Sequence, residues 1–483
     1  MAKNRIAAVL LFIMQAFMSL AQESILDEYI SEGLANNLEI KQKQLSWEKS
    51  RWALKEARGL FMPGLSFNAR YTLAHGGRTI DIPVGDMMND VYHTLYLITE
   101  KMNEYGLADQ VFPDTSLENQ SVKFLRDHEQ ETKLQLVQPL FNTQIFYNYK
   151  VRKEMIAAEE EGIDNIRRNL VAEIKKTYYS YLMTKQLTDL IERTITELDQ
   201  VVEINNSLYK NDKLTIDVIY TLKAEQDNLR QQKKTAEKMG NTASAYLNFL
   251  LNRPLDTPVK VSEVYSLPVI NISAVEAGSS ALQNREELSM LKVKESIENL
   301  VVKLNRYDVL PEIFAVIDYG FQGEEYKFTD QDDYMLASFI LKWDLFRGFQ
   351  NRAAVQQAIL DMEMTSRKIA EVKNRIALQV NHAYNDMDAA FQSVPVASAR
   401  FSNSSGAYTL VKKRYEQDRT DLNFFSRFMD ALTSKASAER NLIETRFDFY
   451  IKYAELERVA ALYELPEMSA MPDAHENYYK SDI

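Results

Sequence analysis

Four aspartates stand beside the two short polar breaks between long helical segments, and these are the residues best placed for chemistry. Asp212 and Asp217 flank the first break, and Asp418 and Asp421 flank the second. Carboxylates repeated around a narrow axis would focus negative potential, favour cations and bind multivalent ones. Alternatively, aspartates at such places end or cap helices. Both interpretations stay open from the sequence.

The other candidates for chemistry are weaker. His75, His93 and His128 lie in one segment, but their separations match no zinc-ligand motif. We find no HExxH, GxSxG or phosphate-binding loop, and the remaining acidic residues follow solvated helical faces. The sequence therefore predicts neither an enzyme nor a bound metal or cofactor.

Two pairs of long helices must position the four aspartates. The predicted helices span about 143–208 and 215–251 in the first pair, and about 351–415 and 423–463 in the second. Apolar residues recur in them at helical spacing, although Pro395 and the stretch 402–406 are expected to kink or break the third helix. At 1.5 Å per residue, the longest would reach about 100 Å. Helices of that length need partners along their whole length, as in a coiled coil.

The chain reads as one module written twice. Asn37 and Asn284 each begin a polar helical run that ends at a proline, Pro63 and Pro311 respectively, and strands and long helices follow each proline. The repeat is too long for a solenoid unit. We interpret it as a duplicated helix-strand-strand-helix-helix module, with a first repeat over 22–270, a second over 271–466 and a polar C-terminal tail over 467–483.

Each half contains two segments in which apolar and polar residues alternate, a pattern typical of strands. They span about 65–75, 130–140, 313–321 and 335–343. Their length suits transmembrane β-strands, but a closed barrel needs at least about eight strands and lipid does not tolerate open edges. Two chains would supply about eight strands and three chains about 12. The long helices must then project from the barrel, which makes the whole a conduit.

Aromatic residues mark the predicted strands. Tyr71, Tyr319, Phe321, Phe339 and Trp343 suit a girdle at a membrane interface. Packing between strand and helix at the inner end of the barrel is the alternative. Residues 75–128 fit neither period, and we expect this insertion to form an external loop that covers or narrows the mouth.

The first residues indicate export. Lys3 and Arg5 precede an apolar stretch from Ile6 to Phe17, and Ala21 ends a small-residue cleavage pattern, so residues 1–21 are predicted to be a signal peptide. No later stretch is long and apolar enough for a transmembrane helix. The chain has 0 cysteines, which excludes disulfides and thiolate catalysis. Its net charge of -12 makes nucleic acid a poor partner.

These features together resemble the TolC family of outer-membrane efflux proteins. The resemblance rests on the order of elements, the duplication, the Asn-x-Glu helix starts, the step Gln138-Pro139-Leu140-Phe141 and the segments around Tyr209 and Tyr415, and it covers about residues 24–466. It implies a mainly α fold with a membrane β-barrel. Three chains, each with four strands, would form a barrel of about 12 strands in the outer membrane. Their helical hairpins would form a trimeric α-barrel in the periplasm.

The resemblance also implies function and partners. TolC-like homotrimers are exit ducts of tripartite efflux pumps or type I secretion systems, and they work with an inner-membrane transporter and a periplasmic adaptor (membrane fusion) protein. Acids ring the periplasmic entrance in some members, a role that would fall here to the four aspartates. The family usually has glycine at the positions of Asp212 and Asp418, and Phe424 stands where an acid is common. The alternative is a soluble periplasmic coiled-coil adaptor or scaffold, which would share the hairpins but lack the paired strands.

Overall fold

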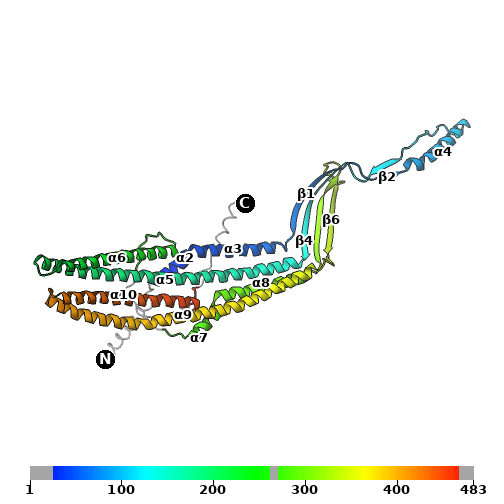
Figure 1. Cartoon of the computed structure of the whole chain (residues 1–483). Coiled ribbons are helices and arrows are strands. Elements are labelled where there is room, and N and C mark those ends of the chain that lie inside the picture. The colour runs from blue at the N-terminus through cyan, green and yellow to red at the C-terminus, as the bar shows by residue number, and fades with distance from the viewer. Residues whose placement is uncertain (1–24, 262–269, 467–483) are drawn as a thin grey trace, which may run out of the picture. The chain divides into compact units, whose positions relative to one another are not determined.

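The computed structural model describes residues 25–261 and 270–466. The predicted signal peptide, the predicted tail and part of the link between the repeats lie outside these residues. The chain divides into two units (Figure 1). The helical unit comprises the described residues of 1–54, 150–302 and 354–483, and the sheet unit comprises 55–149 and 303–353. Among the described helices, none is both long enough and apolar enough to cross a bilayer.

Eight helices of the described chain lie wholly or largely in the helical unit. They are α2 (Ile25–Asn36), α3 (Leu38–Gly59), α5 (Thr143–Lys210), α6 (Ile216–Leu250), α7 (Ala274–Asn284), α8 (Glu286–Tyr307), α9 (Gln350–Gln417) and α10 (Leu422–Val459). α5 and α6 form one long hairpin, and α9 and α10 form the other (Figure 1). These hairpins occupy the segments in which the sequence predicts two pairs of long helices.

The predicted break at Pro395 or in the stretch 402–406 is wrong, because both lie inside α9, which is one continuous helix of 68 residues. A proline inside a helix removes one backbone hydrogen bond and crowds the preceding turn. Val394 and Ala397 on either side are buried against the rest of the bundle. The packing of these neighbours offsets the lost bond.

Two apolar cores hold the hairpins together. The first core gathers residues of both hairpins and of the short helices, including Tyr29, Tyr178, Leu247, Ile376 and Phe447. The second core lies toward the hairpin turns, and its members include Leu198, Leu222, Tyr415 and Phe428. Each core draws on both repeats, so the two hairpins form one bundle.

The two polar helical runs begin differently. Asn37 caps α3, since its Oδ1 accepts from the backbone N–H of Glu39 at 2.9 Å and of Ile40 at 3.3 Å. Its Nδ2 donates to the carbonyl of Leu250 at 3.0 Å. In the second repeat Asn284 is instead the last residue of α7, and α8 begins at Glu286.

The sheet unit contains a four-stranded antiparallel sheet in the order β1-β4-β5-β6. Its strands are β1 (Gly64–Leu73), β4 (His128–Phe141), β5 (Glu312–Gly323) and β6 (Asp333–Lys342). The register of β4 against β5 shifts between Pro139 and Phe141. Proline cannot donate to a ladder, which accounts for an irregularity at this place.

The insertion between β1 and β4 is more ordered than the expected loop. It contains β2 (Thr79–Ile82), α4 (Val84–Glu104) and β3 (Gln120–Lys123), with β2 and β3 paired as an antiparallel ribbon. Gly76 and Gly77, which precede the ribbon, have φ values of 81° and 115°, a conformation that glycine adopts without strain.

Candidate functional site

One face of the four-stranded sheet is apolar. Paired residues in an antiparallel sheet point to the same side, so Leu65 and its partner Leu136 share a face with Ile317 and Ala337. The next row on this face is Phe67, Leu134, Tyr319 and Met335. Phe67 is 68% exposed and Phe339 is 81% exposed. Within the described chain this apolar surface is uncovered, as a lipid-facing wall requires.

The opposite face of the sheet carries a chain of charges. Glu131 lies between Arg70 at 2.9 Å and Lys133 at 3.0 Å, and Lys133 continues to Asp318 at 3.1 Å. The Tyr334 hydroxyl donates to Glu131 at 3.0 Å. The sequence shows alternation in each strand, but it does not show that these particular charges are neighbours. A sheet with one apolar and one charged face suits a wall between lipid and water.

Both edges of this sheet lack a strand partner among the described residues. β1 pairs only with β4 and β6 only with β5. Edge strands present rows of backbone N–H and C=O groups that can pair with another chain. In lipid such backbone groups would have to be paired.

The five predicted interface aromatics are spread along the sheet. Tyr71 stacks on Tyr326 at 5.8 Å, and Phe321 contacts Phe328 edge-on at 5.1 Å. Tyr326 and Phe328 lie in the turn after β5, outside the predicted strands, and are not among the aromatics predicted from the sequence. These four rings gather at one end of the sheet, the end of β1 that carries Leu73.

The other predicted aromatics lie elsewhere on the sheet. Tyr319 contacts Phe321 edge-on at 6.1 Å, and Phe339 is on the apolar face opposite Ala315. At the other end of the sheet, Trp343 donates its Nε1–H to the carbonyl of Val309 at 3.0 Å. Trp343 therefore packs beside the α8–β5 connection, as the alternative interpretation expects, and Tyr71 and Phe321 suit the girdle.

The turn between α5 and α6 places Asp212 in a left-handed conformation, with φ of 57°. Its N–H donates to the Tyr209 carbonyl at 2.9 Å, and the N–H of Lys213 donates to the Leu208 carbonyl at 3.0 Å. A left-handed turn of this kind normally ends with glycine, and aspartate is one of the few other residues that tolerates it. Asp217 is exposed in the first turn of α6, where a carboxylate interacts favourably with the helix dipole.

The turn between α9 and α10 is built by side-chain hydrogen bonds. Asp418 Oδ1 accepts from the N–H of Thr420 at 3.1 Å and from its hydroxyl at 2.8 Å, and these bonds hold the pKa of the Asp418 carboxyl below its usual value. Asp421 caps α10 by accepting from the N–H of Asn423 at 2.7 Å. These bonds agree with the capping interpretation for Asp418 and Asp421.

The ends of both hairpins are joined inside the bundle. Asn205, near the end of α5, is buried and donates to the Tyr415 hydroxyl near the end of α9 at 2.7 Å. Tyr415 stacks on Phe428 at 4.8 Å. The two turns therefore belong to one packed end of the helical unit, where α5 meets α6 and α9 meets α10 (Figure 1). The four aspartates stand in or next to these turns.

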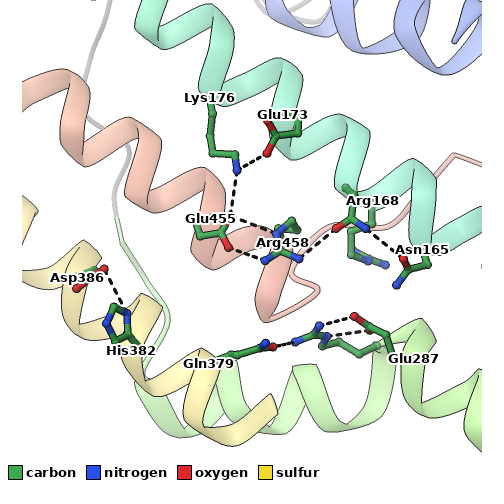
Figure 2. Close-up of polar contacts among 12 residues, drawn as sticks. Asn165, Arg168, Glu173, Lys176, Glu287, Gln379, His382, Asp386, Glu455 and Arg458 are labelled. Carbon is green, nitrogen blue, oxygen red and sulfur yellow. Dashed lines mark hydrogen bonds and ion pairs between the residues drawn. The ribbon is translucent and has the colours of Figure 1, made fainter. Parts of the chain in front are cut away.

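A layer of charged residues crosses the helical unit nearer its middle (Figure 2). Lys176 on α5 contacts Glu173 at 2.5 Å and Glu455 on α10 at 3.3 Å, and Glu455 also pairs with Arg458 at 2.5 Å. Arg285 pairs with Glu287 and donates to Gln379 on α9 at 2.6 Å. Sequence periodicity does not reveal this layer, because its members are far apart along the chain.

Arg168 on α5 is a buried member of the charged layer. It pairs with Glu286 at 2.7 Å, and both residues are buried. Arg168 also donates to the Tyr463 carbonyl at 2.9 Å, and the Tyr463 hydroxyl donates back to the Arg168 carbonyl at 2.8 Å. Burial raises the pKa of Tyr463. These contacts join α5 to the start of α8 and to the segment that follows α10.

The three histidines of the insertion do not come together as a ligand set. His128 Nδ1 lies 3.3 Å from the Tyr71 hydroxyl, and His93 Nδ1 lies 3.4 Å from Asp114. No group of three or more potential ligands placed for a metal ion occurs in the described residues.

Comparisons with known proteins agree with this architecture. Residues 277–460 match the family model "Outer membrane efflux protein". No curated sequence matches the chain. Among solved structures, a membrane protein from Pseudomonas aeruginosa is 17% identical with a TM-score of 0.71, and the match covers 91% of this chain and 94% of that one.

Two channels of known identity give similar matches. The CmeC outer membrane channel of Campylobacter jejuni is 13% identical with a TM-score of 0.72, covering 90% of this chain and 85% of that one. The MtrE outer membrane channel of Neisseria gonorrhoeae is 16% identical with a TM-score of 0.69, covering 90% and 88%. Residues 277–460 thus match the family model of outer membrane efflux proteins, and the described chain as a whole has the fold of these solved outer-membrane channels.

Proposed function

We propose that this protein is the outer-membrane exit duct of a tripartite efflux pump or a type I secretion system. The observation that carries the proposal is the sheet with one apolar face, one charged face and two edges without a partner in the described chain. Such a sheet suits a shared wall in lipid. The family match over residues 277–460 and the outer-membrane channel fold support this function and an outer-membrane location. They are channels rather than enzymes.

The proposed assembly is a homotrimer. Three chains would supply about 12 strands, enough to close a barrel and pair every edge. The helical hairpins would extend into the periplasm as a tunnel, with the four aspartates near its entrance. A periplasmic adaptor and an inner-membrane transporter would complete the pump, and the transporter would supply the energy. The alternative, a soluble periplasmic adaptor or scaffold, is not favoured by the comparisons.

Fractionation of unboiled cells tests the proposal directly. We expect the protein in the outer membrane, as an oligomer that resists SDS and falls to a monomer only on boiling. The same protein extracted without detergent from the periplasm as a soluble species would contradict the proposal. That result would support the adaptor interpretation.

The role of the aspartates needs a separate measurement. We expect Asp217→Asn combined with Asp421→Asn to reduce cation selectivity or alter single-channel conductance in a planar bilayer, because neutral amides remove a ring of negative potential. Asp227→Asn is a matched control, since Asp227 pairs with Arg230 at 3.2 Å farther along α6. Unchanged conductance and selectivity in the double variant would leave Asp421 with its capping role and Asp217 with its interaction with the helix dipole.

A further inference from the structure

Helix α4 in the insertion carries an uninterrupted apolar seam. Its members alternate between steps of four and three residues: Val84, Met88, Val91, Leu95, Ile98, Met102 and the following residue Tyr105. This is the 3-4 spacing of a coiled-coil core, sustained for three heptads without a charged residue. We call these seven residues the α4 seam.

The seam lies on a different face of α4 from the one that packs against the rest of the insertion. Gly85, Asn89, Tyr92 and Thr99 lie one position farther along the helix and meet the returning segment. Gly85 is buried, and a Cβ there would lie 2.3 Å from the Leu117 carbonyl. Tyr92 stacks on Phe112 at 5.9 Å, and Thr99 accepts from the N–H of Phe112 at 2.8 Å.

The seam itself remains open to solvent. Val91 is 49% exposed, Ile98 is 50% exposed and Tyr105 is 73% exposed. Contiguous exposed apolar surface of this kind marks an interaction site in a native protein. The regular 3-4 spacing specifies the occupant more closely, because it matches the knobs-into-holes packing of another helix with the same period.

The residue types in the seam favour more than two helices. In a heptad, position d follows position a by three residues, and the next a follows d by four. In this register the a positions of the seam are Met88, Leu95 and Met102. The d positions are Val84, Val91, Ile98 and Tyr105. Unbranched or γ-branched residues at a with β-branched residues at d shift coiled coils away from dimers toward higher states. Three copies are what the proposed homotrimer supplies.

We propose that the α4 helices of three subunits associate through the α4 seam into a parallel three-helix bundle on the external side of the channel. This inference rests on the proposed function, which supplies the three copies. The insertion leaves β1 after Leu73 and returns at His128, whereas β4 enters the long helices beyond Phe141 at its other end. The insertion and the periplasmic helices therefore leave the sheet at opposite ends.

Tethering makes the association favourable even for a short seam. Only residues 74–78 and 124–127 separate the β2–β3 ribbon from the ends of β1 and β4. Short tethers hold attached modules at effective concentrations of about millimolar. The bundle would narrow the outer mouth, so that cargo passes around or between its helices.

Site-specific cross-linking in intact cells tests the bundle, because the chain has 0 cysteines. Ile98→Cys places a thiol in the seam, and Leu97→Cys places one a quarter turn away on a residue of similar exposure, 45% against 50%. After mild oxidation we expect disulfide-linked pairs of subunits for Ile98→Cys and at least ten times less for Leu97→Cys. Residue 98 meets residue 98 only in a parallel, in-register arrangement.

A second set of variants controls for disulfides that form by random collision and not through packing of the seam. Ile98→Asp should abolish linking through Val91→Cys in the same seam, and Leu97→Asp should leave that linking intact. Equal linking by Ile98→Cys and Leu97→Cys, or linking of Ile98→Cys to a different protein, would overturn the bundle.

The heat-modifiable oligomer of each variant is scored on the same gels. An oligomer without any Ile98→Cys linking overturns the bundle and leaves the proposed function standing. Absence of the oligomer in the unmodified protein refutes the trimer and the bundle together.

Discussion

The two longest helices, α5 of the first repeat and α9 of the second, are equal in length but buried in different ways. In α5 the consecutive residues Leu170, Val171 and Ala172 are all buried, so neighbours surround that part of the helix. In α9 the buried residues follow one line at steps of three and four: Ile376, Val380, Ala383, Met387, Ala390, Val394 and Ala397. One copy of a duplicated helix is central in the subunit, and the other is peripheral.

The peripheral helix carries apolar side chains on its open faces. Met364 is 68% exposed, Leu378 is 70% exposed and Val396 is 69% exposed. In the proposed trimer these side chains would face the next subunit. If the two halves are repeats, as the sequence predicts, the comparison shows equivalent helices in different roles: α5 is packed inside the subunit, and α9 is available for contacts between subunits.

The largest expected effect distinguishes the charges of the two helices. Arg168→Ala on α5 leaves the buried Glu286 without its charged partner, which should cost about 3–5 kcal/mol. Arg375 on α9 pairs with Glu371 at an exposed site, so Arg375→Ala should have no measurable effect. Urea unfolding of the purified oligomer in detergent measures both. Similar losses for the two variants would break the comparison.

Substitutions in the two edge strands should have similar effects, in contrast to those in the two helices, because β1 and β6 are equivalent edges of the sheet. Phe67→Arg and Phe339→Arg put a charge on the apolar face and should each destabilise the folded barrel, by up to about 2–4 kcal/mol for a site at the bilayer midplane and less for a site nearer an interface. Asn68→Arg and Ser338→Arg on the other face are the matched controls. The yield of heat-modifiable oligomer reports the effect, and loss in the controls alone would reverse the assignment of the faces.

Substitutions in the two hairpin turns should change the stability of the helical unit in opposite directions. Asp212→Gly relieves a left-handed non-glycine residue and should stabilise the helical unit by up to about 1 kcal/mol. Asp421→Ala removes the cap of α10 and should cost about 0.5–2 kcal/mol. Thermal unfolding in detergent gives both values. The same sign for both would mean that the two turns are built alike.

The smallest expected effect is on the stability of the folded protein at low pH. Burial by itself would raise the pKa of the Glu197 carboxyl on α5, but hydrogen bonds from Lys412 and Tyr408 and the charge of Lys435 outweigh it and lower the pKa. Because the folded pKa lies below the ordinary 4.5, this stabilisation is present at neutral pH and is lost as the pH falls through the folded value. Glu197→Gln should therefore flatten the stability profile below about pH 4.5. An unchanged profile would show that another group governs the acid response.

The sequence predicts the order of elements well because prolines and turn residues punctuate it. Pro63 and Pro311 separate helix from strand, and alternation over Leu65–Leu73 identifies β1 and the side of it that is apolar. The prediction of a mainly α channel fold is confirmed by the solved structures. The efflux-duct function and the outer-membrane location stay proposals, which the family match over residues 277–460 supports.

What the sequence misses depends on distant partners or on weak local signals. α4 follows Pro83 without a side-chain cap, and its seam mixes methionine with valine and leucine, so its helical period was overlooked. The pairing of Arg168 with Glu286 joins residues 118 positions apart, which no local pattern specifies. The roles of the tip aspartates stay predictions, because charge near an axis depends on the assembled trimer.

The open edges of β1 and β6 have a consequence for how the protein reaches its membrane. A solitary subunit cannot cross the lipid with those backbone groups unpaired, so insertion and association must occur as one event. The rate of insertion should then climb more steeply than linearly with the amount of newly exported chain. During any delay the same strands would be prone to pair with the wrong neighbour. In the proposed trimer, a subunit is thus most prone to mispairing while it waits for two further copies.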